Sequence, residues 1–177
     1  MKVQRGFSMI ELLISVLIMS IGVLGMAGLQ TLSLQQNRSA LLQGEAGLLV
    51  NDILDRIRAN PSSDYSGIAL NTVPGSTTNC VGSICSEVEM MNFDRTQWLC
   101  SINSTDAAGV QHTVCGDFGV TGTMPGGQCV ALTDPCAGGS IVLAGGIYTV
   151  TVQWLDQQTV DQTNGQRRSV SVSMKAP

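Results

Sequence analysis

The sequence predicts an α+β fold, in which a long N-terminal helix packs on a small C-terminal antiparallel β-sheet. Three observations predict it: an apolar run near the N-terminus, an amphipathic helical pattern after it, and two alternating stretches near the C-terminus. A length of 177 residues suits one small domain and an anchor. The formal net charge of −4 lacks the basic excess that is typical of a nucleic-acid-binding surface.

Residues 7–29 form an apolar run in which Glu11 is the only charge. The run is long enough to span a bilayer, which needs about 20 apolar residues. Lys2 and Arg5, in a short leader at residues 1–6, place its start on the cytoplasmic side. A cleaved secretory signal would have a shorter apolar core. A plain membrane anchor is the other alternative, but a carboxylate inside the membrane costs about 2.5–3.5 kcal/mol on insertion scales, so we expect Glu11 to have a function.

The helical pattern continues through residues 30–60 and ends at Asn60-Pro61, because proline disfavours the α conformation in the residue before it. An amphipathic stripe recurs at steps of three and four residues: Leu34, Leu41, Leu42, Leu48, Leu49, Ile53, Leu54 and Ile57. The spacings of Asp52 to Arg56 and of Asp55 to Arg58 favour ion pairs on a helix. A helix over residues 7–59 would be about 80 Å long, which is too long to be buried in one small domain. We therefore expect its first half to lie in lipid or against other subunits.

Residues 61–177 are expected to form a globular domain. It begins with a connector at residues 61–79 that is rich in Ser, Asn, Gly and Pro. Residues 97–102 and 128–132 are predicted to be short strands.

Two alternating stretches, residues 146–155 and 168–175, are predicted to pair as an antiparallel hairpin. The segment between them contains Asn164-Gly165, a strong turn pair. One face of the hairpin carries large apolar side chains and is expected to cover the helix from Ser33 to Ala59. These side chains are Tyr148, Val150, Val152 and Trp154 on the first strand and Val170, Val172 and Met174 on the second.

The cysteines all lie beyond the apolar run, on the side opposite Lys2 and Arg5, where disulfides persist if that side is the periplasm. They are Cys80, Cys85, Cys100, Cys115, Cys129 and Cys136. Six cysteines allow 15 pairings, of which we predict one bridge, between Cys129 and Cys136. Neither a metal site nor a cofactor is expected, because no Cys-x-x-Cys occurs and His112 is the only histidine.

The segment Gly6-Phe7-Ser8-Met9-Ile10-Glu11 resembles the class III signal of type IV pilins and type II secretion pseudopilins. The resemblance implies that a prepilin peptidase cuts between Gly6 and Phe7 and then N-methylates Phe7. Glu11 matches the glutamate that this family carries five residues into the mature chain. An unpaired carboxylate is costly in a core of packed helices, so the expected partner of Glu11 is the N-terminal amine of Phe7 in a neighbouring subunit.

Further segments, at residues 25–30, 51–61 and 146–156, are similar to the PilV family of minor pilins of type IV pili. This resemblance implies a pilin-like fold and a minor pilin that helps to initiate pilus assembly. It also implies a place in the pilus tip complex, in support of adhesion and twitching motility. The implied partners are other minor pilins, the major pilin, a tip adhesin, the prepilin peptidase and the inner membrane. The implied location is the inner membrane, with the C-terminal domain in the periplasm, before the protein reaches the pilus on the cell surface.

Three other functions are weaker. A type II secretion minor pseudopilin would share the signal and the scaffold, but the Asp-Arg-Ile-Arg-Ala-Asn-Pro segment favours pili. A DNA- or surface-binding minor pilin would need a basic patch, whereas the only cations beyond Ala59 are Arg95, Arg167, Arg168 and Lys175. An enzyme is not expected, because no nucleophile, phosphate-loop or metal-ligand motif appears, and Glu87 and Glu89 are expected to be solvated charges.

Overall fold

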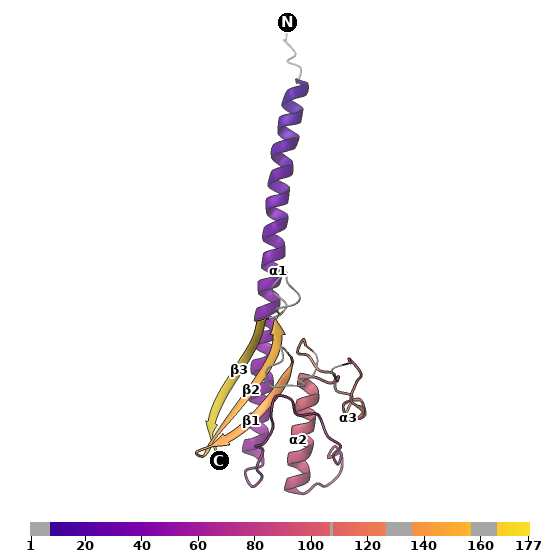
Figure 1. The fold of residues 1–177 in the computed structure, drawn as a ribbon, viewed down its shortest axis with the longest axis vertical. Coiled ribbons are helices and arrows are strands. Elements are labelled where there is room, and N and C mark those ends of the chain that lie inside the picture. The colour runs from indigo at the N-terminus through magenta and orange to yellow at the C-terminus, as the bar shows by residue number, and fades with distance from the viewer. Residues whose placement is uncertain (1–7, 107, 127–135, 157–165) are drawn as a thin grey trace. The chain divides into compact units, whose positions relative to one another are not determined.

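The computed structural model describes residues 8–106, 108–126, 136–156 and 166–177 (Figure 1). It divides into two compact units, Met1–Ala40 and Leu41–Pro177. Its elements, in chain order, are α1 (Met9–Ala59), α2 (Glu87–Ile102), α3 (Thr113–Asp117), β1 (Gly138–Ala144), β2 (Ile147–Asp156) and β3 (Gln166–Lys175). The predicted α+β class, a long N-terminal helix with a small antiparallel sheet, is confirmed.

Helix α1 has 51 residues and ends at Ala59, as the Asn60-Pro61 pair predicts. Its buried face, however, is shorter than the predicted stripe. The buried side chains are Ala46, Val50, Ile53, Leu54 and Ile57. Leu34, Leu41 and Leu48, which belong to the predicted stripe, are 69%, 70% and 72% exposed. These three leucines are seven residues apart, which is about two helical turns, so they form a row of their own. That row lies on a different side of the helix from the buried residues.

The sheet is antiparallel with strand order β1-β2-β3. The predicted hairpin is confirmed: Tyr148 is opposite Met174, and Val150 is opposite Val172. Its connection, with Asn164-Gly165, lies outside the described residues. Strand β1 was not predicted. Gly145 and Gly146 join it to β2 with φ of +57° and +74°, a conformation that glycine adopts without a steric penalty.

One hydrophobic core joins the end of α1 to the sheet and to α2 within the second unit. Its members include the predicted inner face of β2, where Tyr148, Val150, Val152 and Trp154 are all at most 4% exposed. The half-buried Val170, Val172 and Met174 of β3 pack against the core from the sheet edge. Gly139 permits the close approach of α2 to β1, because a Cβ there would lie 2.5 Å from the Trp98 ring and from Cδ1 of Ile102.

Residues 97–102 are the last part of α2, so the strand predicted there is wrong. A capping box starts this helix: the Ser86 hydroxyl accepts a hydrogen bond from the Glu89 amide at 3.3 Å, and the Glu89 carboxylate accepts one from the Ser86 amide at 2.9 Å. The helix then buries Phe93, Trp98 and Ile102, among others, at helical spacing. The strand predicted at residues 128–132 lies outside the described residues.

The connector at residues 61–79 contains no helix or extended strand. It touches the sheet through one bridge, in which the Gly67 amide donates to the Ile141 carbonyl at 3.1 Å and the Ile141 amide donates to the Ile68 carbonyl at 2.9 Å. This bridge fixes the connector along the outer edge of β1.

Candidate functional site

The first unit exposes most of its apolar side chains along α1. Its large apolar side chains from Met9 to Leu34 are between 50% and 82% exposed. In the part of the chain that the structure describes, α1 is the one helix that is long and apolar enough to cross a membrane. An exposed apolar surface of this extent is typical of a segment that contacts lipid or other proteins.

Three hydroxyl groups in this segment donate hydrogen bonds within the helix. Ser15, Ser20 and Thr31 donate to the carbonyls of Leu12, Leu17 and Gly28, each at 2.8 Å. In an apolar environment a polar group without a partner costs several kcal/mol. These internal bonds therefore make the segment compatible with lipid or with a dry helix interface.

Glu11 lies in the first turn of α1 and is exposed. Its amide donates to the Ser8 carbonyl at 3.1 Å, and its negative charge is favourable near the positive end of the helix dipole. It is the only charged residue from Met9 to Asn37. Gly6 and Phe7 lie outside the described residues, so the cleavage site and the pairing of Glu11 with the Phe7 amine stay predictions.

A polar junction links the end of α1 to α2. Arg56 donates through Nη1 to Oδ1 of Asp94 at 2.9 Å and to Oε1 of Gln97 at 2.7 Å, and through Nε to Asp52 at 3.0 Å. Tyr65 donates to the other Asp94 oxygen at 2.7 Å. The predicted pairs of Asp52 with Arg56 and of Asp55 with Arg58 are both present. Asp94, which completes the junction, was not anticipated from the sequence.

Charge and burial set the protonation of this junction. Burial alone lowers the pKa of Arg56, but its hydrogen bonds and charge interactions with Asp94 and Asp52 more than offset this and raise the pKa above its ordinary value. Burial, together with the hydrogen bond to Asp94, raises the pKa of Tyr65 well above its usual range. At neutral pH the arginine is therefore charged and the tyrosine neutral.

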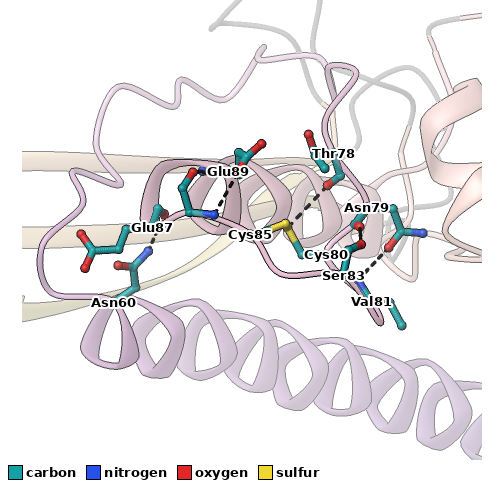
Figure 2. Close-up of a disulfide and its surroundings, with 10 residues drawn as sticks. Asn60, Thr78, Asn79, Cys80, Val81, Ser83, Cys85, Glu87 and Glu89 are labelled. Atoms are coloured by element: carbon teal, nitrogen blue, oxygen red, sulfur yellow. Dashed lines mark hydrogen bonds between the residues drawn. A yellow bond between two sulfur atoms is a disulfide. The ribbon is translucent and has the colours of Figure 1, made fainter.

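Asn60 adds a second link between α1 and α2. Its side-chain amide donates to the Glu87 carbonyl at 2.8 Å, close to the start of α2 (Figure 2). It also lies 3.3 Å from the Tyr65 hydroxyl. The segment that resembles PilV, residues 51–61, thus positions α2 on α1 through Arg56 and Asn60.

Two disulfides fix the cysteine-bearing middle of the domain. Cys80 pairs with Cys85 immediately before α2 (Figure 2), and Cys100 pairs with Cys115, which ties α2 to α3. Cys136 is buried and disulfide-bonded. Its predicted partner, Cys129, lies outside the described residues.

Glu87 and Glu89, at the start of α2, do not form a paired-carboxylate site. Glu87 and Glu89 are exposed and two residues apart on a helix, so their side chains do not face each other. Hydrogen bonds from Ser86 lower the pKa of Glu89, which serves as a helix cap. Among the described residues, no group of three His, Cys, Asp or Glu side chains is placed to hold a metal ion.

Two family models match the chain. The prokaryotic N-terminal methylation motif matches residues 1–27, and the type IV pilin Tt1218 family matches residues 28–96. Together they support a type IV pilin. Type IV pilins are structural proteins that associate with other pilins and are processed by a prepilin peptidase. The second match ends within α2, and neither match is to the PilV subfamily. No curated protein and no solved structure matches the chain.

Proposed function

We propose that this chain is a minor pilin of the PilV type, which takes part in initiating type IV pilus assembly and in the pilus tip complex, and so supports adhesion and twitching motility. The observation that carries the proposal is the exposed apolar segment of α1, with Glu11 as its single charge. Such a segment first anchors the protein in a membrane and later packs against the helices of other subunits.

Processing and assembly are chemically linked in this proposal. Cleavage after Gly6 creates a positive amine on Phe7, and N-methylation retains that charge. In a filament core the amine of one subunit pairs with Glu11 of its neighbour, because each group alone would be costly in a low-dielectric environment. The partners are other minor pilins, the major pilin and a tip adhesin.

The disulfides support a place outside the cytoplasm for the second unit, since disulfides persist in oxidising compartments. The protein would reside in the inner membrane, with its C-terminal domain in the periplasm, before it enters the pilus tip at the cell surface.

A Glu11→Leu variant tests the assembly contact. It should still insert into the membrane and still be cleaved, because the substitution removes an insertion penalty and lies outside the scissile bond. Its co-purification with the other minor pilins, and the number of surface pili, should fall. The matched control is Glu45→Leu, which removes an exposed carboxylate from the same helix beyond the apolar segment and should behave as wild type.

If Glu11→Leu entered the minor-pilin complex and supported pili at wild-type levels, Glu11 would not be an assembly contact.

Deletion of the gene separates the pilus role from a type II secretion role. A pilin deletion should reduce pili and twitching, whereas a pseudopilin deletion would block secretion and leave pili intact.

A further inference from the structure

A cavity of about 460 Å³ lies between one face of α2 and the connector. The helix contributes Asn92, Arg95 and Thr96 to its wall, and the connector contributes the hydroxyl-bearing stretch 76–78 together with Thr72. This volume is within the range of small-molecule sites, which is about 300–1,000 Å³. The wall carries five hydroxyl groups, one side-chain amide and one guanidinium, together with the apolar side chains of Ile68, Val73 and Leu99.

Arg95 is the cation of this cavity, and it is half-buried. In the described part of the second unit, Arg56, Arg58 and Arg168 each lie within 4.0 Å of a carboxylate. No described carboxylate lies within that distance of Arg95, and Asp64 acts on it only as a more distant charge. Burial lowers the pKa of Arg95, yet a guanidinium stays charged at neutral pH, so the cavity holds a positive charge without an ion-pair partner.

Glu89 also lines the cavity, but its carboxylate is already engaged. It accepts hydrogen bonds from the amide and the hydroxyl of Ser86, at 2.9 and 2.8 Å, at the start of α2. Its charge therefore interacts with the helix N-terminus, and the guanidinium remains available to a ligand.

The walls of the cavity are held in place before any ligand arrives. The Thr96 hydroxyl donates to the Gly75 carbonyl at 3.4 Å, and the Ala69 amide donates to the Thr72 hydroxyl at 2.9 Å. The Cys80–Cys85 bridge fixes the chain where the connector enters α2. A preformed site lowers the entropy that binding would otherwise lose.

We propose that this cavity binds a carboxylate-bearing sugar, as found at the end or along the chain of an acidic glycan. Arg95 takes the carboxylate in a bidentate pair, and Asn92 and the connector hydroxyls take the sugar hydroxyls. This inference goes beyond pilus assembly and does not depend on it.

Binding is tested with the full chain in micelles of a detergent without a sugar headgroup, by isothermal titration or ligand-observed NMR. The probes are glucuronic acid, glucose, which lacks the carboxylate, and acetate, which lacks the hydroxyls. We expect a dissociation constant of about 1 mM or lower for glucuronic acid, and values at least about tenfold higher for the other two. Equal affinity for acetate would overturn sugar recognition, equal affinity for glucose would overturn the role of Arg95, and no saturable glucuronic acid binding would overturn the site.

Four variants locate the contact. Arg95→Gln should weaken glucuronic acid binding at least about tenfold, and Asn92→Ala a few-fold, whereas Arg58→Gln, an exposed arginine of α1, should leave it unchanged. Glu89→Gln should strengthen it, because glutamine keeps the capping box and removes a like charge. Circular dichroism checks that each variant is folded. Should Arg95→Gln not fold, the opposite directions expected for Asn92→Ala and Glu89→Gln decide; unchanged affinity in both would contradict the proposal.

Discussion

Asp94 links α2 to both α1 and the connector through a buried carboxylate. Its side chain is 10% exposed, and its two oxygens accept from different groups, Arg56 and Tyr65. A carboxylate in such a position stabilises the fold only while both donors are present, since its burial alone is unfavourable. The same argument predicts that a substitution of Arg56 would destabilise the fold, because Arg56 bridges Asp94, Asp52 and Gln97.

Asp94→Ala should lower the free energy of unfolding by about 3 kcal/mol, because it removes the acceptor of the Tyr65 hydroxyl and leaves Arg56 with only Asp52 and Gln97 as acceptors. Urea unfolding of the full chain in micelles, followed by the fluorescence of the buried Trp98 and Trp154, measures this change. The control is Asp55→Ala, which removes an exposed pair with Arg58 and should cost at most about 1 kcal/mol. Equal losses for the two variants would contradict the importance of Asp94.

The raised pKa values of two tyrosines predict how the free energy of unfolding responds to alkaline pH. The pKa of Tyr65 is raised in the folded state by burial and by Asp94, and that of Tyr148 by burial and by its hydrogen bond to Asp64. An unfolded tyrosine releases its proton near pH 10, so above that pH the unfolded state binds fewer protons than the folded state. The free energy of unfolding should be unaffected by these groups below pH 10 and should fall as the pH rises further.

Absorbance at 295 nm measures tyrosinate directly, and urea unfolding at pH 9, 10 and 11 measures the stability. Tyr65→Phe should make the loss of stability with pH less steep. Titration of both tyrosines near pH 10 in the folded chain would show that neither pKa is raised.

At the scale of elements, the sequence predicted best where local signals act alone. The alternation along β2 and β3 set their pairing and their buried face, and Pro61 set the end of α1. The misassigned residues 97–102 show the opposite case, because their apolar and aromatic side chains fit a strand as well as a helix. The Ser-x-x-Glu capping box at Ser86 was the signal for a helix, and Gly145-Gly146 was the signal for a turn after β1.

The residues of the candidate site also differ in how far the sequence alone identifies them. Gly6, Phe7 and Glu11 are recognisable because their signal is contiguous in the sequence. Arg95 was noticed only as one of a few cations, because its environment depends on the connector, about 20 residues earlier in the chain, folding over α2. No local pattern in the sequence encodes that contact.

The two described disulfides should differ in their contribution to stability. Cys100–Cys115 spans 15 residues and Cys80–Cys85 spans five. Loop-closure entropy assigns about 3 kcal/mol to the longer loop and about 2 kcal/mol to the shorter one. The buried Cys100 and Cys115 also fill space in the interior, so replacing both by alanine should cost more than this difference alone.

Urea unfolding of the double alanine variants of each pair measures the two costs. Removal of Cys80–Cys85 should leave the pairing of Cys100 with Cys115 intact, as thiol alkylation followed by peptide mass analysis would show. A larger loss from the Cys80–Cys85 variant than from the Cys100–Cys115 variant would contradict the prediction.

At the scale of the whole molecule, the predicted cleavage after Gly6 would set the first residue of the mature chain. We predict that the protein isolated from membranes begins with N-methyl-Phe7, because the Gly6-Phe7 junction matches the methylation motif. Intact-mass spectrometry of the membrane fraction is the measurement. Gly6→Val should remain uncut, since a branched side chain replaces the smallest residue at the scissile bond, and Met1 retained in the wild-type protein would contradict the prediction.

The disulfides described above join cysteines that are neighbours in the sequence: Cys80 with the next one, Cys85, and Cys100 with the next one, Cys115. A chain that is exported progressively toward its C-terminus delivers its thiols to the far side of the membrane in that same order. An oxidant that joins each thiol to the one that emerges next therefore makes both bridges correctly at the first attempt. Sequential pairing of this kind would leave no wrong pair to reshuffle among these four cysteines.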